Sequence, residues 1–180
     1  KDYFTKVFEA ARTLDPQNRP LTGAFEKNSA PDKCRCYQLR DFICLNRYYG
    51  WYISGGAEME EAEVKVRAEM DKWAAKKLNV PLVFTEFGTD TLATEHKLPA
   101  IMWSQEYQNE YLAMNFSVFD SYDFVQGELV WNFADFQTSE GVMRVKGNKK
   151  GIFTRQRQPK EADFNFKRRW ESLPLNYKGE

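Results

Sequence analysis

The sequence predicts an α/β fold built on a parallel sheet, and three observations support this class. Short apolar runs alternate along the chain with longer stretches in which apolar residues recur at helical spacing. One of these runs, residues 81–84, lacks polar alternation, which is typical of a strand buried on both faces of a parallel sheet. Strands that alternate with helices are joined by crossovers and lie parallel to one another.

The length and composition fit one folded domain. The chain has 180 residues, of which 42% are hydrophobic and 16% aromatic, so a core can form. Its 26 basic and 26 acidic residues give a formal net charge of zero, which provides no general attraction to nucleic acid or to an anionic membrane. No apolar run approaches the roughly 20 residues that span a bilayer. We therefore expect neither nucleic acid nor a membrane among the partners.

The cysteine and histidine content argues against a metal site. Cys34, Cys36 and Cys44 form an odd set without CxxC spacing, and His96 is the single histidine. A zinc site needs four ligands in a closed spacing pattern. We interpret Cys44 as a core residue, because it lies in the apolar run 42–45, and the other two cysteines as free thiols in a reducing compartment. His96 is expected to be a surface residue.

The first third of the chain predicts a helix and two strands. Residues 1–14 carry a helical apolar stripe that Asp15 and Pro16 terminate. Residues 19–25 favour a short strand, and a poorly marked helix would follow before residue 41. Residues 41–52 begin as an apolar strand and end in polar and aromatic side chains.

The rest of the chain repeats the strand and helix pattern. Residues 58–78 predict a helix with glutamates in its first turns and lysines in its last, as the helix dipole favours. Residues 81–88 predict a strand that leaves Glu86 at its carboxyl end, because Gly88 permits a sharp exit. The remaining elements are a helix over residues 104–119, a strand over 124–133, a long loop, and a last helix with Ala162, Phe166, Trp170 and Leu173 on one face.

This order of elements corresponds to half of a (β/α)8 barrel. A complete eight-stranded barrel needs about 250 residues, whereas 180 residues supply about four strands. We therefore interpret residues 1–180 as one partial barrel domain. A half-barrel leaves two open edges and an uncovered core, so we expect either that the chain is part of a longer protein or that the rest of the barrel is supplied elsewhere. The carboxyl ends of barrel strands hold active sites, which makes Glu86 a candidate.

Four motifs give the sequence a family resemblance. They are NRYYGWY (residues 46–52), TEFG (85–88), WNFADF (131–136) and GNKKGIFTR (147–155). In this order they resemble the C-terminal half of the catalytic barrel of the β-glucuronidases, members of glycoside hydrolase family 2. The resemblance covers nearly the whole chain. It implies a hydrolase that cleaves β-D-glucuronides with retention and needs no metal or cofactor.

The resemblance also implies catalytic roles. Glu86 matches the family nucleophile, and Tyr48 matches the tyrosine that donates to this carboxylate. Phe87 departs from the family, since many relatives carry tyrosine there. A retaining enzyme needs a second carboxyl about 5 Å from the first, and in the family this acid/base follows an asparagine at a strand end. Asn109–Glu110 lies mid-helix instead, so we expect the acid/base to lie outside this chain.

Further residues match the substrate-binding positions of the family. Asn148 and Lys150 resemble the pair that holds the C6 carboxylate of glucuronic acid. Two residues apart in an extended loop, their side chains can point the same way and offer an amide N–H and a positive charge. Arg144 is expected to reinforce this site and Trp131, at the end of the last strand, to support the sugar ring. The weaker members of the pocket wall are Asn46, Trp51 and Tyr52.

Two alternatives stay open at this point. One is a related family 2 hydrolase for another sugar, and the other is a non-catalytic carbohydrate-binding or scaffold subunit. The expected partners are glucuronide small molecules or glycans, the rest of the barrel, and further copies of the full-length protein. The first residues lack the layout of a signal peptide, and we expect a cytoplasmic, bacterial protein. Glu128 is expected to be a structural ion-pair partner, and the chain alone to be inactive.

Overall fold

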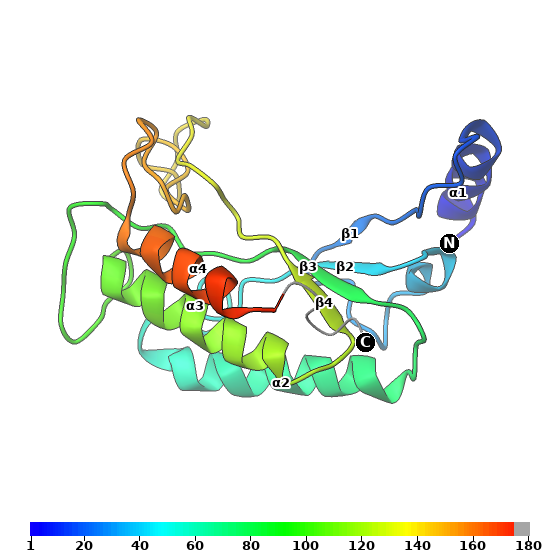
Figure 1. Cartoon of the computed structure of the whole chain (residues 1–180), viewed down its shortest axis with the longest axis horizontal. Helices are drawn as coiled ribbons and strands as arrows, with labels where there is room; N and C mark the ends of the chain where they lie inside the picture. Colours follow the sequence, from blue (N-terminus) through cyan, green and yellow to red (C-terminus); the bar gives the residue numbers. More distant parts are fainter. Residues whose placement is uncertain (175–180) are drawn as a thin grey trace.

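Four parallel strands form a single sheet in the order β1-β2-β3-β4 (Figure 1). The computed structural model describes residues 1–174. The strands are β1 (Ala24–Phe25), β2 (Ile43–Asn46), β3 (Leu82–Glu86) and β4 (Val125–Glu128). Each strand pairs with the next one along the chain, so the carboxyl ends of all four meet at one edge of the sheet.

Four α-helices are found among the described residues. α1 (Asp2–Leu14) precedes β1, and α2 (Met59–Ala75), α3 (Gln105–Asp120) and α4 (Glu161–Ser172) follow β2, β3 and β4. Figure 1 shows α2, α3 and α4 on the same side of the sheet, with α2 against α3 and α3 against α4. The helix expected before residue 41 is reduced to one 3-10 turn, η1 (Cys36–Leu39), and a second 3-10 turn, η2 (Gly56–Glu58), precedes α2.

The core lies between the sheet and these helices. Phe84 of β3 stacks on Phe119 of α3, with ring centroids 3.9 Å apart. Phe87 is fully buried and meets the same Phe119 ring edge-on at 5.0 Å. The residue after Glu86 therefore faces the helix layer, and a tyrosine hydroxyl at this position would enter the core.

The strands are shorter than predicted, and the one expected over residues 19–25 is reduced to Ala24–Phe25. The strand expected over residues 41–52 ends at Asn46 because the chain turns there: the Tyr48 carbonyl accepts the N–H groups of Trp51 and Tyr52 at 3.0 and 3.1 Å. The strand expected over 124–133 ends at Glu128. Apolar and aromatic residues continue past both ends, so composition alone did not mark the boundaries.

Glu128 has the structural role that the sequence predicts. Its carboxylate forms a bidentate pair with Arg169 of α4, at 2.7 Å from Nε and 2.8 Å from Nη2. This contact fixes α4 to the strand that precedes it.

The three cysteines are unpaired, and Cys44 is buried, as expected.

The first helix has a different environment. None of its residues is buried, and Tyr3 and Leu14 are 73% and 80% exposed. Figure 1 shows α1 at the opposite end of the molecule from α4.

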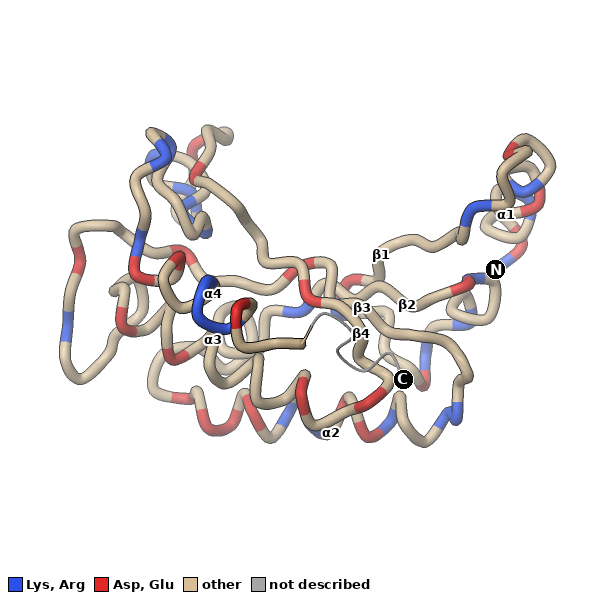
Figure 2. The backbone as a smooth tube through the Cα atoms, viewed as in Figure 1, with Lys and Arg blue, Asp and Glu red and all other residues tan. Residues whose placement is uncertain are grey.

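Figure 2 shows acidic and basic residues mixed along α2, which is consistent with a solvated outer face. Within residues 1–174, no helix is both long and apolar enough to cross a bilayer.

A buried ionic network connects α2 to the segment after β2. The Glu69 carboxylate accepts hydrogen bonds from Arg47 Nη2 at 2.6 Å, Tyr49 OH at 2.8 Å and Trp73 Nε1 at 3.2 Å. The Arg47 side chain is only 1% exposed, so the Glu69 carboxylate is needed to compensate its buried positive charge. The network therefore holds the chain on both sides of Tyr48.

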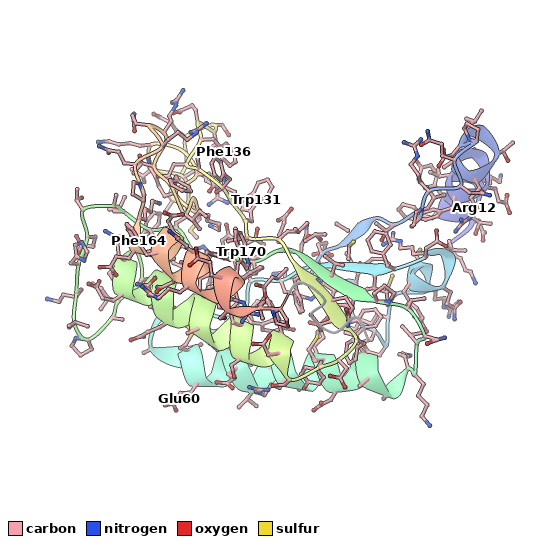
Figure 3. The ribbon with its side chains drawn as sticks, viewed as in Figure 1. Arg12, Glu60, Trp131, Phe136, Phe164 and Trp170 are labelled. Atoms are coloured by element: carbon pink, nitrogen blue, oxygen red, sulfur yellow. The ribbon has the colours of Figure 1, made fainter. Side chains whose placement is uncertain are left out.

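We predict that Glu69→Ala destabilises the protein strongly, by about 3–5 kcal/mol, because it leaves the Arg47 guanidinium buried without a counter-charge. The measurement is urea unfolding of the full-length protein. Glu60→Ala is the matched control, since Glu60 lies on the outer side of α2 (Figure 3) and exposed substitutions change stability by about 0.5 kcal/mol or less. Equal unfolding midpoints for the two variants would contradict the prediction.

Candidate active site

A cavity of about 370 Å³ opens at the carboxyl ends of the strands. Its walls come from the ends of β1, β2 and β3 and from the turn after β2. The lining residues are Glu26, Lys27, Asn46, Tyr48, Tyr52, Ile53 and Glu86. Four residues that the sequence singled out, Asn46, Tyr48, Tyr52 and Glu86, thus line one cavity.

Glu86 and Tyr48 are in direct contact. The Tyr48 hydroxyl donates to Glu86 Oε2 at 2.7 Å. Burial of the phenol raises the pKa of Tyr48 well above its usual value, and the hydrogen bond to Glu86 raises it further. Tyr48 therefore stays protonated and serves as a hydrogen-bond donor to the Glu86 carboxylate. Asn46, opposite Glu86 in the strand register, accepts a hydrogen bond from Thr85 Oγ1 at 2.7 Å.

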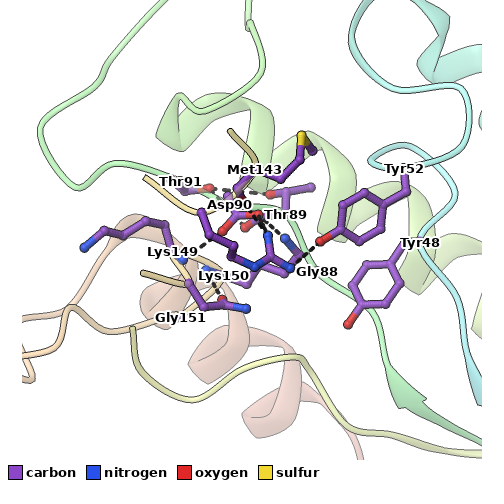
Figure 4. Close-up of polar contacts among 12 residues, drawn as sticks. Tyr48, Tyr52, Gly88, Thr89, Asp90, Thr91, Met143, Lys149, Lys150 and Gly151 are labelled. Carbon is purple, nitrogen blue, oxygen red and sulfur yellow. Dashed lines mark hydrogen bonds and ion pairs between the residues drawn. The ribbon is translucent and has the colours of Figure 1, made fainter. Parts of the chain in front are cut away.

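Lys150 lies near Tyr48 as well. Its ammonium is 4.8 Å from the Tyr52 ring centroid, 5.0 Å from that of Trp51 and 5.9 Å from that of Tyr48. The side chain is 1% exposed, and Nζ pairs with Asp90 Oδ2. Figure 4 shows this pair beside Tyr52 and Tyr48. The Tyr48 hydroxyl therefore contacts the Glu86 carboxylate, and the ring of the same residue lies 5.9 Å from the Lys150 ammonium.

Asp90 is the residue of this site that sequence reasoning missed. Its carboxylate is fully buried. Besides Lys150 it accepts the backbone N–H of Lys149 at 2.8 Å and lies 3.4 Å from Arg144 Nη1. An acidic residue four positions after Glu86, in the loop that leaves β3, was the available signal.

Arg144 spans from Asp90 to the cavity wall. Its Nη2 donates to the Tyr52 hydroxyl at 2.7 Å. Burial lowers the pKa of Arg144, but the hydrogen bond to Tyr52 and the charge of Asp90 outweigh burial, so the pKa is raised overall. The guanidinium therefore remains a cation next to Lys150.

Asn148 is held by the backbone of its own loop. Its side chain is 3% exposed, and Oδ1 accepts the N–H of Lys150 at 2.9 Å. Gly147 has a φ of +96° that favours glycine, and a side chain there would meet the Phe136 carbonyl. The amide group of Asn148 consequently has a fixed orientation beside the Lys150 backbone.

A second buried pair supports the same loop. Lys160 Nζ donates to Asp135 Oδ1 at 2.9 Å and to the Lys149 carbonyl at 2.8 Å. Burial lowers the pKa of Lys160 although Asp135 opposes the shift. Asp135 also accepts the N–H of Gly151 at 3.0 Å, so the loop of residues 147–151 is fixed from both sides.

The structure corrects the position of Trp131. This residue lies three positions beyond β4 rather than at its end. Its ring meets Phe136 edge-on at 6.0 Å, and Figure 3 shows both on the segment after β4. A Cβ at Gly88 would lie 2.0 Å from the Trp131 carbonyl oxygen, so only glycine lets the two segments approach this closely.

The second carboxylate of the cavity, Glu26, was not predicted. The N–H and Nδ2 groups of Asn28 hold its oxygens at 2.9 and 3.1 Å. Glu26 follows β1 and lines the same cavity as Glu86, which ends β3. Glu110 lies elsewhere, in a hollow of about 520 Å³ between α3 and α4.

His96 has partners that the sequence did not indicate. It is a surface residue as predicted, but its Nδ1 lies 2.9 Å from Glu106 and 3.8 Å from Glu161. The N–H groups of Lys97 and Glu106, together with this imidazole, lower the pKa of Glu106 to about 2. Gln105 Nε2 faces His96 Nε2 at 3.1 Å, which places the ring proton on Nδ1, toward Glu106. The contact links the N-terminal ends of α3 and α4.

Comparison with known proteins identifies the family. The profile of "Glycosyl hydrolases family 2, TIM barrel domain" matches residues 1–175. Among curated proteins, the chain is 47% identical to a β-glucuronidase of Paenibacillus borealis over 171 residues and 41% identical to that of Homo sapiens over 170 residues. These matches cover 95% and 93% of this chain but 28% and 25% of the relatives. The chain thus spans about a quarter of their length.

Solved structures agree with this result. A β-glucuronidase from Ruminococcus gnavus in complex with uronic isofagomine is 73% identical, with a TM-score of 0.93, and the match covers 94% of this chain and 29% of that protein. The predicted fold class, an α/β barrel of the TIM type represented here by four strands, is confirmed. On the family profile and these relatives together, the chain belongs to the TIM barrel domain of glycosyl hydrolase family 2.

Proposed function

We propose that the full-length protein to which this chain belongs hydrolyses β-D-glucuronides with retention of configuration, with Glu86 as the nucleophile. The observation that carries the proposal is the arrangement around Tyr48, which donates to Glu86 while its ring lies 5.9 Å from the Lys150 ammonium. A carboxylate that can attack and a cation that can hold a uronate thus border one side chain. The names of the relatives, β-glucuronidases over almost all of this chain, support the same substrate class.

Glu86 would act through its ionised form. In a retaining mechanism the carboxylate attacks the anomeric carbon and forms a glycosyl-enzyme ester, which water then hydrolyses. The hydrogen bond from Tyr48 favours the anion. A second carboxyl must protonate the leaving oxygen, and we propose that it comes from the part of the full-length protein outside these residues.

Lys150, Arg144 and Asn148 would bind the sugar carboxylate. The Lys150 ammonium has three N–H donors, and Asp90 occupies one of them. A charge-assisted hydrogen bond contributes about 1.5–3 kcal/mol, which corresponds to roughly a 10- to 100-fold preference over a neutral sugar. The ligand of the Ruminococcus gnavus structure, uronic isofagomine, carries such an acid group.

The remainder of the full-length protein would complete the barrel. The described sheet ends at β1 on one side and β4 on the other. Apolar side chains near these edges are exposed, Leu129 by 56% and Phe133 by 59%, as is the apolar stripe of α1. We propose that the other half of the barrel covers these residues, and that further copies of the full-length protein are partners.

We predict that Glu86→Gln in the full-length protein lowers kcat on 4-nitrophenyl β-D-glucuronide by roughly 10⁴-fold or more, because an amide cannot form the glycosyl ester. The measurement is steady-state hydrolysis, with thermal unfolding to confirm an intact fold. Glu110→Gln is the matched control, because Glu110 is exposed on α3. The activity of this variant should stay near that of the unmodified protein. Normal turnover by Glu86→Gln would refute the assignment.

We predict that Lys150→Ala removes the preference for a uronate. The kcat/KM for 4-nitrophenyl β-D-glucuronide should fall about 10- to 100-fold more than that for the corresponding glucoside, because one charged contact to the C6 carboxylate is lost. Lys149→Ala is the control, since its Nζ faces Asp135 at 3.9 Å and its backbone N–H is kept. Equal losses on both substrates would exclude Lys150 as the uronate ligand.

A further inference from the structure

We infer that Asp90 is a positioning residue for the carboxylate of the sugar. Its buried carboxylate holds Lys150 and Arg144 in place, and through them it sets the preference for a uronate over a neutral sugar. The inference rests on the proposed function, because it concerns the same site. It adds a residue that does not itself touch the substrate.

The contacts of Asp90 converge from the two segments that border the site. Lys150 Nζ and the Lys149 N–H come from the loop of residues 147–151, and Arg144 Nη1 comes from the segment before it. In the reverse direction, the N–H of Thr91 donates to the Lys149 carbonyl at 3.0 Å. The exit of β3 and the loop of Lys150 are therefore joined at Asp90 and at Thr91 (Figure 4).

The cations that contact Asp90 outnumber its own charge. Lys150 and Arg144 contribute two positive charges and Asp90 one negative charge, so this group of three carries a net charge of +1. A sugar carboxylate would bring the sum of this group to zero, whereas a neutral sugar would leave it at +1. The arrangement therefore favours an acidic sugar over a neutral one.

Asp90 also competes with the substrate for Lys150, and burial decides which effect is larger. The Lys150 side chain is 1% exposed among the rings of Trp51 and Tyr52, so water cannot replace a lost counter-charge. Without Asp90, the ammonium on its flexible stem would lie next to the Arg144 guanidinium with no fixed anion between them. The two cations would separate, and the geometry that a carboxylate recognises would be lost.

The test compares two inhibitors that differ only in the group at the sugar C6 position, uronic isofagomine and isofagomine. Their dissociation constants are measured by calorimetry on the full-length protein and on Asp90→Asn, which keeps the shape of the side chain and removes its charge. Asp90→Asn should weaken uronic isofagomine roughly 10- to 100-fold and change isofagomine less than about threefold. For 4-nitrophenyl β-D-glucuronide, the effect should appear mainly in KM.

Asp135→Asn is the matched control, because Asp135 also pairs with a buried lysine and also binds the loop of residues 147–151. A general disturbance of the loop would weaken both inhibitors in both variants. Asp90→Glu, which restores the charge, should recover part of the uronate affinity. The inference is overturned if Asp90→Asn keeps or tightens uronic isofagomine binding, or if it weakens the two inhibitors equally.

The same measurements separate this inference from the proposed function. If the unmodified protein does not prefer uronic isofagomine, or if Lys150→Ala does not reduce that preference, the proposed uronate site is wrong. If both results hold and Asp90→Asn leaves the preference unchanged, only the role of Asp90 is wrong.

Discussion

The site depends on one constraint, which is that the buried Lys150 ammonium needs a counter-charge. The Lys150 side chain is 1% exposed and its partner Asp90 is fully buried. A lysine in such surroundings keeps its charge only with a well-placed anion. That anion lies on the loop leaving β3, four residues after Glu86, so the pair fixes the proposed uronate-binding loop, residues 147–151, relative to the strand that carries the proposed nucleophile.

Two more buried pairs extend this support outward. Lys160 and Asp135 hold the far side of the loop of residues 147–151. Arg47 and Glu69 hold the segment after β2, from which Tyr48 reaches Glu86. Each pair joins an element of the helix layer, or its N-terminal end, to a segment at the carboxyl edge of the sheet. The polar rim is thus built on ionic contacts, and the sheet and helices beneath it on aromatic packing.

The sequence predicted the parts of this structure that local pattern determines. The apolar run that ends at Glu86 is β3, and the periodic stretches became α2 and α3 within three residues. The extents of β2 and β4 were overestimated because aromatic residues such as Tyr49 and Trp131 continue beyond the ladder into turns. Motif resemblance singled out Tyr48 and Lys150. The place of Asp90 in the loop after β3 could be seen in the sequence, but its ion pair could not be predicted because the partner is 60 positions away in the chain.

The direction of Phe87 has a consequence for sorting related sequences. Phe87 lies just beyond β3, and its ring touches Phe116 and Phe119 of α3, so the position after Glu86 points to the helix layer. Whether a homologue has phenylalanine or tyrosine at this position is therefore a matter of core packing. Classifications of substrate preference that use this position as a marker would group enzymes by core packing.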